Sequence, residues 1–243
     1  VPGNHDLVLR LRALPGVVAT NRYPVHVVAR PHAPFPVRVL GTGPVEPALR
    51  AIGARVGHEG PAVVGEGELV THAEDVVRLL EDGGTVVVLA QPVEAAGHYP
   101  VPITIDAVAT VWGSTEFHFT TDQGALPSLP RRNVLVAEDS TVHAHTVISR
   151  VADGAFPDVP VVIAYKPVPG AITGTIVGEH AVGAGRLLLC QYRLASGVLA
   201  GDAAARALLA DVVRWAAAPR PALVAASGTA ANGSAVTTYR SAG

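Results

Sequence analysis

The chain has 243 residues, of which 49% are apolar, and its formal net charge is −2. This length and apolar share suffice for one large domain, or for one domain with part of another. The basic residues are scattered, which speaks against nucleic acid and anionic membranes as partners. No apolar run reaches the roughly 20 residues of a transmembrane helix. The N-terminal residues lack a signal-peptide pattern, so the localisation stays unknown.

Cysteine and methionine usage gives two further constraints. Cys190 is the only cysteine, which excludes an intrachain disulfide and a cysteine-based zinc cluster. It lies inside the apolar stretch RLLLCQY, where we expect a small buried side chain. The sequence has no methionine, even at position 1, and we therefore expect a fragment that was processed or cut from a longer protein.

Residues 1–29 contain two alternating apolar and polar runs joined at Pro15-Gly16, a pattern typical of a β-hairpin. Two strands alone are only marginally stable in water. We therefore expect the last hairpin of a β-sandwich whose other strands lie upstream, or a hairpin that pairs with another chain. The proline-rich residues 30–36 are predicted to be a linker.

Residues 37–217 are predicted to form an α/β domain, because short apolar strands alternate with amphipathic helices there. We expect a mostly parallel sheet with flanking helices. Predicted strands cover residues 36–40, 61–67, 85–90, 133–138, 160–166, 174–182 and 185–192. The last two are expected to form a hairpin.

Three amphipathic helices are predicted in this domain. The first, at 45–54, presents Val45, Ala48, Leu49 and Ile52 on one face. The second opens at Thr71 with a capping box to Glu74, and its predicted buried stripe is Ala73, Val76, Val77 and Leu80. The third is capped by Asp202, and its predicted apolar face is Ala205, Leu208, Leu209, Val212, Val213 and Ala216.

Two segments lack a clear periodicity. Residues 97–133 are rich in proline, glycine, threonine and aromatic residues, and are predicted to be an irregular insertion that serves function or covers another surface. Residues 218–243 have the composition of a C-terminal linker tail, with SAVTTY as its one candidate strand.

The turn after the first strand of this domain resembles the start of a dinucleotide-binding motif, with Gly41 and Gly43 as G-x-G. The third glycine of that motif would fall at position 46, which is Glu46. A carboxylate there would face the pyrophosphate at the helix N-terminus. We therefore interpret this segment as an ordinary strand-to-helix turn and expect no cofactor.

The turn after strand 85–90 is where an amidotransferase or α/β hydrolase would carry its nucleophile. It holds Gln91 and Pro92, neither of which can attack a carbonyl. We interpret Gln91 as a vacant nucleophile position and expect it to hydrogen-bond a neighbouring loop.

Histidines and carboxylates offer weaker candidates. His143 and His145 would share one face of a strand, but no third ligand stands at a telling spacing, so no metal is expected. Glycoside hydrolysis needs two carboxylates that flank the bond, and the sequence alone places no pair at the required separation. Solvated or capping roles are favoured for the candidates Glu116, Asp122, Glu138 and Asp139.

Aromatic side chains cluster in VWGSTEFHF within the insertion. Trp112, Phe117 and Phe119 could stack on a sugar or pack the insertion against the sheet, and packing is favoured. If the segment does bind a substrate, the candidate residues are Trp112, Glu116, Phe117 and His118.

The order of these segments resembles the C-terminal region of bacterial family 2 glycoside hydrolases, the β-galactosidase and β-glucuronidase group. The resemblance covers about residues 7–217. Its most specific parts are WGSTEFHF and GRLLLCQYRL with the helix that follows, AAARALLADVVRWA. The resemblance also includes the strand ending in Asn21 to Tyr23, the proline linker and GGTVVVLAQP.

The resemblance implies a sugar-binding jelly roll, an immunoglobulin-like sandwich and a catalytic (β/α)8 barrel with two glutamates, all upstream of what this sequence contains. It implies a flavodoxin-like, class I glutamine amidotransferase-like domain without its nucleophile. No residue here matches the family's catalytic glutamate motifs, so no catalytic residue is assigned.

The leading hypothesis is thus a non-catalytic C-terminal accessory portion of a glycoside hydrolase, whose partner is the catalytic portion in the same or a separate chain. Whether this chain is itself an enzyme stays open. Carbohydrate is a candidate ligand, and self-association is a further alternative. The two rival hypotheses are a carbohydrate-binding module and a stand-alone amidotransferase-type enzyme.

Overall fold

The computed structural model describes residues 3–13, 16–27, 34–108, 117–120, 125–129, 144–166, 172–219, 223–229 and 235–241. Its strands are β1 (Gly3–Ala13), β2 (Gly16–Val27), β3 (Pro36–Leu40), β4 (Arg55–Gly57), β5 (Ala62–Val64), β6 (Thr85–Val88), β7 (Ile103–Ala107), β8 (Phe117–Thr120), β9 (Thr146–Val151), β10 (Val159–Lys166), β11 (Ile172–Val182), β12 (Gly185–Cys190), β13 (Leu223–Thr229) and β14 (Ala235–Ser241). Its helices are α1 (Val45–Ala51), α2 (Leu69–Glu81), α3 (Leu194–Leu199) and α4 (Ala203–Ala217), with a 3₁₀ helix, η1 (Val93–His98).

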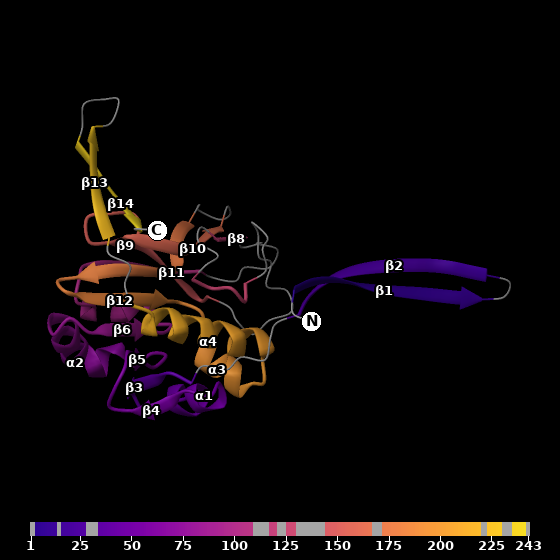
Figure 1. Ribbon diagram of the computed structural model, residues 1–243, viewed down its shortest axis with the longest axis horizontal. Coiled ribbons are helices and arrows are strands. Elements are labelled where there is room, and N and C mark those ends of the chain that lie inside the picture. Colours follow the sequence, from indigo (N-terminus) through magenta and orange to yellow (C-terminus); the bar gives the residue numbers. More distant parts are fainter. Residues whose placement is uncertain are drawn as a thin grey trace.

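A central sheet organises the α/β body, in the strand order β4-β3-β5-β6-β12-β11-β10-β8 (Figure 1). The first five of these strands run parallel to one another. The remaining pairs are antiparallel, and β9 joins β7 to β11. The expected α/β class with a mostly parallel central sheet and flanking helices is therefore correct.

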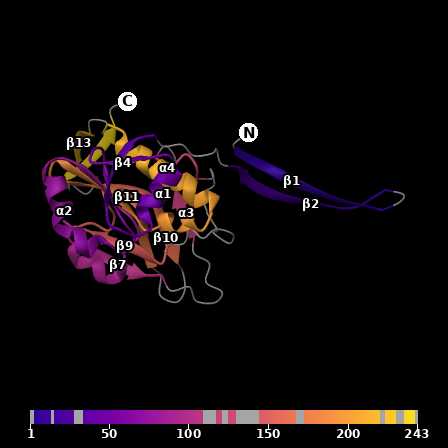
Figure 2. The ribbon, with the colours of Figure 1, turned by 90° about the horizontal axis from the view of Figure 1, so that it is seen from below.

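The parallel strands are buried on both faces. Alternate residues of one strand belong to two separate apolar clusters: Val87 packs on one face of β6, and Val86 and Val88 on the other. The first cluster is completed by α1, α3 and α4, and the second by α2, η1 and β7. This two-sided covering explains why TVVVLA is continuously apolar instead of alternating. Figure 2 shows these helices around the sheet.

Helices α1 and α4 follow the predicted periodicity. All four residues predicted for the buried face of the first helix are buried, and so is the predicted face of the last. The Asp202 side chain accepts hydrogen bonds from the backbone N–H groups of Ala204 and Ala205, at 2.7 and 3.0 Å, which confirms it as the N-cap of α4.

Helix α2 departs from the prediction. It begins at Leu69 instead of Thr71, so the predicted capping box does not form. Its N-cap residue is Glu68, whose carboxylate turns instead toward the turn after β3. Val76 and Leu80 are buried as predicted and Ala73 is half-buried, whereas Val77 is exposed. Leu69, which the predicted stripe did not include, is buried.

The segments without periodicity contain more regular structure than predicted. Within residues 97–133, β7 pairs with β9 and β8 pairs with β10. Both strands are short and depend on partners distant in the sequence, which local patterns do not reveal. The tail forms a hairpin of β13 and β14 instead of one strand, and the predicted strand 133–138 lies outside the described residues.

The hairpin of β1 and β2 runs away from the α/β body in both views (Figures 1 and 2). Its register places Leu7, Leu9 and Leu11 on one face with Tyr23 and Val25 of the partner strand. All five side chains are exposed, Leu11 by 64%. The opposite face is largely polar, with the exposed ion pair Asp6–Arg22. The hairpin is thus amphipathic, with an uncovered apolar face.

No helix among the described residues is long and apolar enough to cross a membrane.

Candidate functional site

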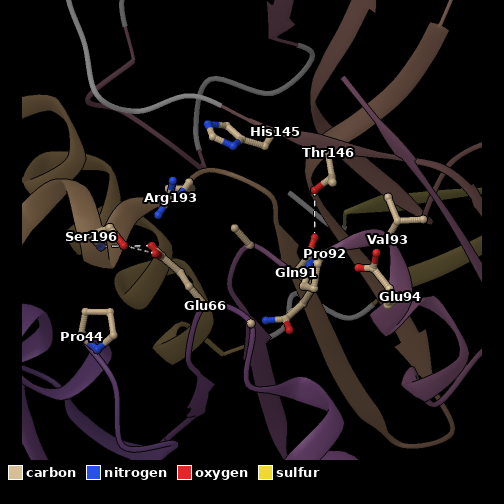
Figure 3. A pocket seen from close by; sticks show the side chains of 12 residues that line it. Pro44, Glu66, Gln91, Pro92, Val93, Glu94, His145, Thr146, Arg193 and Ser196 are labelled. Atoms are coloured by element: carbon tan, nitrogen blue, oxygen red, sulfur yellow. Dashed lines mark hydrogen bonds between the residues drawn. The ribbon is translucent and has the colours of Figure 1, made fainter. Parts of the chain in front are cut away.

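A pocket of about 630 Å³ opens where the parallel strands β5, β6 and β12 end (Figure 3). In an open α/β sheet, the carboxyl ends of the strands are the common place for a ligand site. The pocket is lined by Pro44, Glu66, Gly67, Ala90, Gln91, Pro92, Val93, Glu94, His145, Thr146, Arg193 and Ser196.

Gln91 lies at the base of this pocket and is almost completely buried. Its Nε2 donates to the backbone carbonyls of Gly65 (2.8 Å) and Leu89 (2.7 Å). Its Oε1 accepts from the backbone N–H of Leu69 (3.1 Å), the first residue of α2. The side chain therefore ties β6 to the loop after β5, as predicted, and its amide is held in a structural role.

The backbone around Gln91 also differs from a nucleophile elbow. Such an elbow is a sharp, strained turn between a strand and a helix. Among the described residues other than glycine, a positive φ is found at Ala152 and not at Gln91. The helix after Gln91 is η1, a 3₁₀ helix of six residues that begins after the extended Pro92. The turn therefore lacks the strain that would project a reactive side chain.

Gln191 and Thr146 support the same turn. Gln191 Oε1 accepts from the backbone N–H of Gln91 (3.0 Å). The Thr146 hydroxyl lies 2.9 Å from both Gln191 Oε1 and the Gln91 carbonyl oxygen. All three residues are buried. The ends of β6 and β12 and the start of β9 are thus joined by buried hydrogen bonds, which makes the floor of the pocket rigid.

Glu66 holds the start of α3 beside the pocket. Its Oε1 accepts from the backbone N–H groups of Ala195 (2.8 Å) and Ser196 (3.2 Å). Its Oε2 accepts from the Ser196 hydroxyl. The same carboxylate thus accepts from two backbone N–H groups and one hydroxyl at the start of α3. Glu66 therefore caps and stabilises the start of this helix.

The G-x-G turn holds an internal carboxylate. Glu68 Oε1 accepts from the backbone N–H groups of Thr42 (2.9 Å) and Gly43 (3.0 Å). A Cβ at Gly41 or Gly65 would come within 1.8 Å of Glu68 Oε2, so a larger residue at either position would displace this carboxylate. Gly41 also has a φ of +133°, which favours glycine. The sequence predicts the carboxylate of Glu46 at this turn, whereas in the structure Glu46 pairs with Arg50 at 2.7 Å on α1 and the carboxylate at the turn is that of Glu68.

Three charged or titratable side chains of the lining have no hydrogen bond or ion pair with other described residues: Glu94, His145 and Arg193. All three are exposed toward solvent. Figure 3 shows Arg193 and His145 on one side of the segment Gln91–Pro92 and Glu94 on the other. Within the described part of the chain, the pocket therefore presents donors and acceptors that other side chains do not occupy.

Cys190 is excluded from this chemistry by its burial. It is 1% exposed within β12, as predicted for a small apolar side chain. Burial raises the pKa of Cys190 to about 12, against a smaller opposing effect of a backbone hydrogen bond at Tyr192. Burial likewise raises the pKa of Tyr99 above its ordinary value. Neither group is a nucleophile or base at neutral pH.

The sequence-predicted substrate residues lie elsewhere or outside the described residues. Trp112 and Glu116 are outside them, as are Asp122, Glu138, Asp139 and His143. Phe117 and His118 belong to β8, with backbones opposite Tyr165 and Ala164 of β10. His145 directly precedes β9 and lines the pocket, and its predicted pairing with His143 lies outside the described residues.

No group of three or more histidine, cysteine, aspartate or glutamate side chains suited to a metal occurs in the part of the chain that the structure describes.

Several lining residues were missed by motif-based reasoning, among them Glu66, Glu94 and Arg193. None belongs to a recognisable motif. The signal that could have identified two of them is positional: Glu66 follows β5 and Arg193 follows β12, so parallel pairing brings both to the same edge of the sheet.

No known family model matches the sequence, and no curated protein matches it either. Among solved structures, one titled "Crystal structure of Agd3 a novel carbohydrate deacetylase" superposes with a TM-score of 0.44 at 12% identity. The match covers 74% of this chain and 32% of that chain, so this chain spans about a third of that protein. A likeness of this extent carries no functional information.

Proposed function

We propose that this chain is a non-catalytic accessory portion of a glycoside hydrolase, in which hydrolysis is carried by a separate catalytic portion. The non-catalytic role in this proposal is supported by the hydrogen bonding of Gln91. Its side chain makes hydrogen bonds to the loop after β5, the end of β6 and the start of α2. The place where related α/β enzymes hold their nucleophile serves here to stabilise the fold.

The proposal also includes a more specific fold for the α/β body and for the N-terminal hairpin. We infer a flavodoxin-like domain of the class I glutamine amidotransferase type, preceded by the terminal hairpin of an immunoglobulin-like sandwich. Five parallel strands with helices on both faces support the first part. The amphipathic form of β1 and β2 supports the second part, because a sandwich strand alternates between a core face and a solvent face.

The partner is the catalytic portion of the same glycosidase. The assignment to family 2 glycoside hydrolases rests on the sequence resemblance in WGSTEFHF and GRLLLCQYRL. A docking role is supported by the uncovered apolar face of the hairpin, since apolar patches of this kind mark interfaces.

The test is the intact and native mass of every polypeptide in the protein purified from its source, with glycosidase activity measured on aryl glycosides. We expect this sequence within, or together with, a larger polypeptide that carries the activity. A lone active chain of 24.9 kDa would contradict the proposal. So would hydrolysis by the isolated chain at a rate above that of a denatured control.

A glutaminase assay separates this proposal from an amidotransferase-type enzyme. We expect no ammonia release from glutamine by the isolated chain, because the one cysteine is buried and protonated. Glutaminase activity that disappears in Cys190→Ser would overturn the proposal.

A further inference from the structure

We propose that the pocket at the carboxyl edge of the parallel strands binds a neutral sugar, with Arg193 and Glu94 as its principal hydrogen-bonding side chains. This inference deepens the proposed function and rests on it. It assigns a ligand class to a site that the sequence motifs do not mark.

The first argument is hydrogen-bonding capacity. Arg193 offers donors and Glu94 offers acceptors, and neither makes a hydrogen bond or ion pair with other described residues. His145 offers one of each when its imidazole is neutral. A sugar hydroxyl both donates and accepts, so hydroxyls at different positions of a saccharide can bond a guanidinium on one side of the pocket and a carboxylate on the other.

The second argument is charge. A small anion would meet Arg193, but it would also meet the carboxylates of Glu94 and Glu66 in the same lining. Phosphate-bearing ligands are disfavoured further by Glu68, which bonds the N–H groups of the neighbouring G-x-G turn. A neutral ligand avoids this repulsion and can still bond Arg193, Glu94 and His145.

The third argument is shape. The volume of about 630 Å³ lies within the usual range of small-molecule sites and has room for more than one sugar ring. Pro44, Pro92 and Val93 add apolar surface against which the C–H face of a pyranose can pack. The buried hydrogen bonds of Gln91, Thr146 and Gln191 fix the floor before any ligand arrives, which lowers the entropic cost of binding.

The experiment is a titration of the full chain with a panel of neutral hexoses and their disaccharides, including lactose and cellobiose, followed by calorimetry and saturation-transfer NMR. Citrate serves as the anionic probe. We expect saturable binding of at least one sugar. Arg193→Ala and Glu94→Gln should each raise its Kd by about tenfold or more, because each removes a hydrogen bond to a charged group.

The matched controls are Arg55→Ala and Glu59→Gln, two exposed residues that do not line this pocket. They should leave the Kd unchanged within about twofold, since surface substitutions away from a site have small effects.

Three outcomes would overturn the inference: no saturable sugar binding by the wild-type chain, binding of citrate alone, or sugar binding that neither pocket variant weakens. None of them would decide the accessory role, because that role is tested independently by the masses and activity of the native protein. A lone active chain, in turn, would remove the proposed function while the sugar titration still reported on the pocket.

Discussion

At the scale of single residues, the Gln91 side chain holds the turn after β6 by buried hydrogen bonds. We expect Gln91→Ala to lower the free energy of unfolding by about 2–4 kcal/mol, because it removes the side-chain partner of the Leu89 carbonyl and of the Leu69 N–H. It also removes one of the two hydrogen bonds to the Gly65 carbonyl, which keeps its bond from the Glu68 N–H. Urea denaturation followed by circular dichroism measures the change.

The isosteric variant Gln91→Glu separates hydrogen bonding from volume. Its carboxylate can still accept from Leu69, but it cannot donate to the carbonyls of Gly65 and Leu89, so we expect a loss of similar size at neutral pH. Glu94→Ala is the control, since Glu94 is exposed on the same loop and should change stability by less than about 0.5 kcal/mol. Equal effects of the three variants would mean that the Gln91 amide does not hold the turn.

Cys190 gives a second prediction at this scale. With its pKa raised to about 12 by burial, the thiol stays protonated between pH 7 and 9, and the thiolate forms only as pH approaches 12. We expect iodoacetamide to leave the native protein unmodified across that range and to label it rapidly in urea, as read by intact mass. Fast labelling of the native chain at pH 7 would mean that the thiol is accessible and ionised.

At the scale of elements, a buried ion pair joins the sheet to the last helix. Arg186 on β12 pairs with Glu179 on β11 at 2.8 Å, and both side chains are at most 9% exposed. Arg186 Nη1 also donates to the backbone carbonyls of Ala216 and Ala218 at 3.4 and 2.9 Å, at the end of α4. The guanidinium thus donates to carbonyls at the C-terminal end of α4, where intrahelical partners are missing.

We expect Arg186→Ala to lower the free energy of unfolding by about 3–5 kcal/mol, because it removes one member of a buried ion pair and takes the guanidinium away from the buried Glu179 carboxylate. Arg50→Ala breaks the exposed pair with Glu46 on α1 and should cost less than about 1 kcal/mol. Thermal and urea denaturation of both variants check the difference. A similar, small loss in the two would show that the buried pair adds nothing to stability.

Some helices and strands could be predicted from sequence patterns, and others could not. Helices α1 and α4 are amphipathic with a wide apolar face, so periodicity identified their buried residues. The start of α2 was misplaced because Glu68 bonds the distant turn at Thr42 and Gly43, which no local capping pattern encodes. Strands β7 and β8 were missed because short strands are stabilised by partners far along the chain.

The candidate site was harder to predict than the fold. Gln91 could be identified because it follows a continuously apolar strand. Glu66, Glu94, His145 and Arg193 come from four separate segments of the chain, and only the strand order brings them to one pocket. The candidate substrate residues predicted from the sequence come from the aromatic cluster near Trp112, although packing is favoured there, because clustered aromatic residues stand out in a sequence. Polar residues that gather at a sheet edge only in the folded protein have no such sequence pattern.

At the scale of the whole molecule, the hairpin of β1 and β2 has an exposed apolar face. Leu7, Leu9 and Leu11 share an exposed face with Tyr23 and Val25, whereas Val8 lies on the opposite face beside Arg22. An isolated two-stranded hairpin with such a face is marginally stable and prone to associate. We therefore expect the isolated chain to self-associate as its concentration rises and to bind the dye ANS.

The substitution Leu9→Lys places a charge in the centre of the apolar face and should reduce both the association and the dye binding. Val8→Lys is the matched control, because it adds the same charge on the same strand but on the polar face. Sedimentation velocity over a concentration series measures the association. A wild-type chain that stays monomeric at high concentration without binding ANS would contradict the docking role of this face. Equal effects of the two lysine substitutions would show that association depends on net charge and not on the apolar face. The proposal that the catalytic portion covers this face would then lose its support.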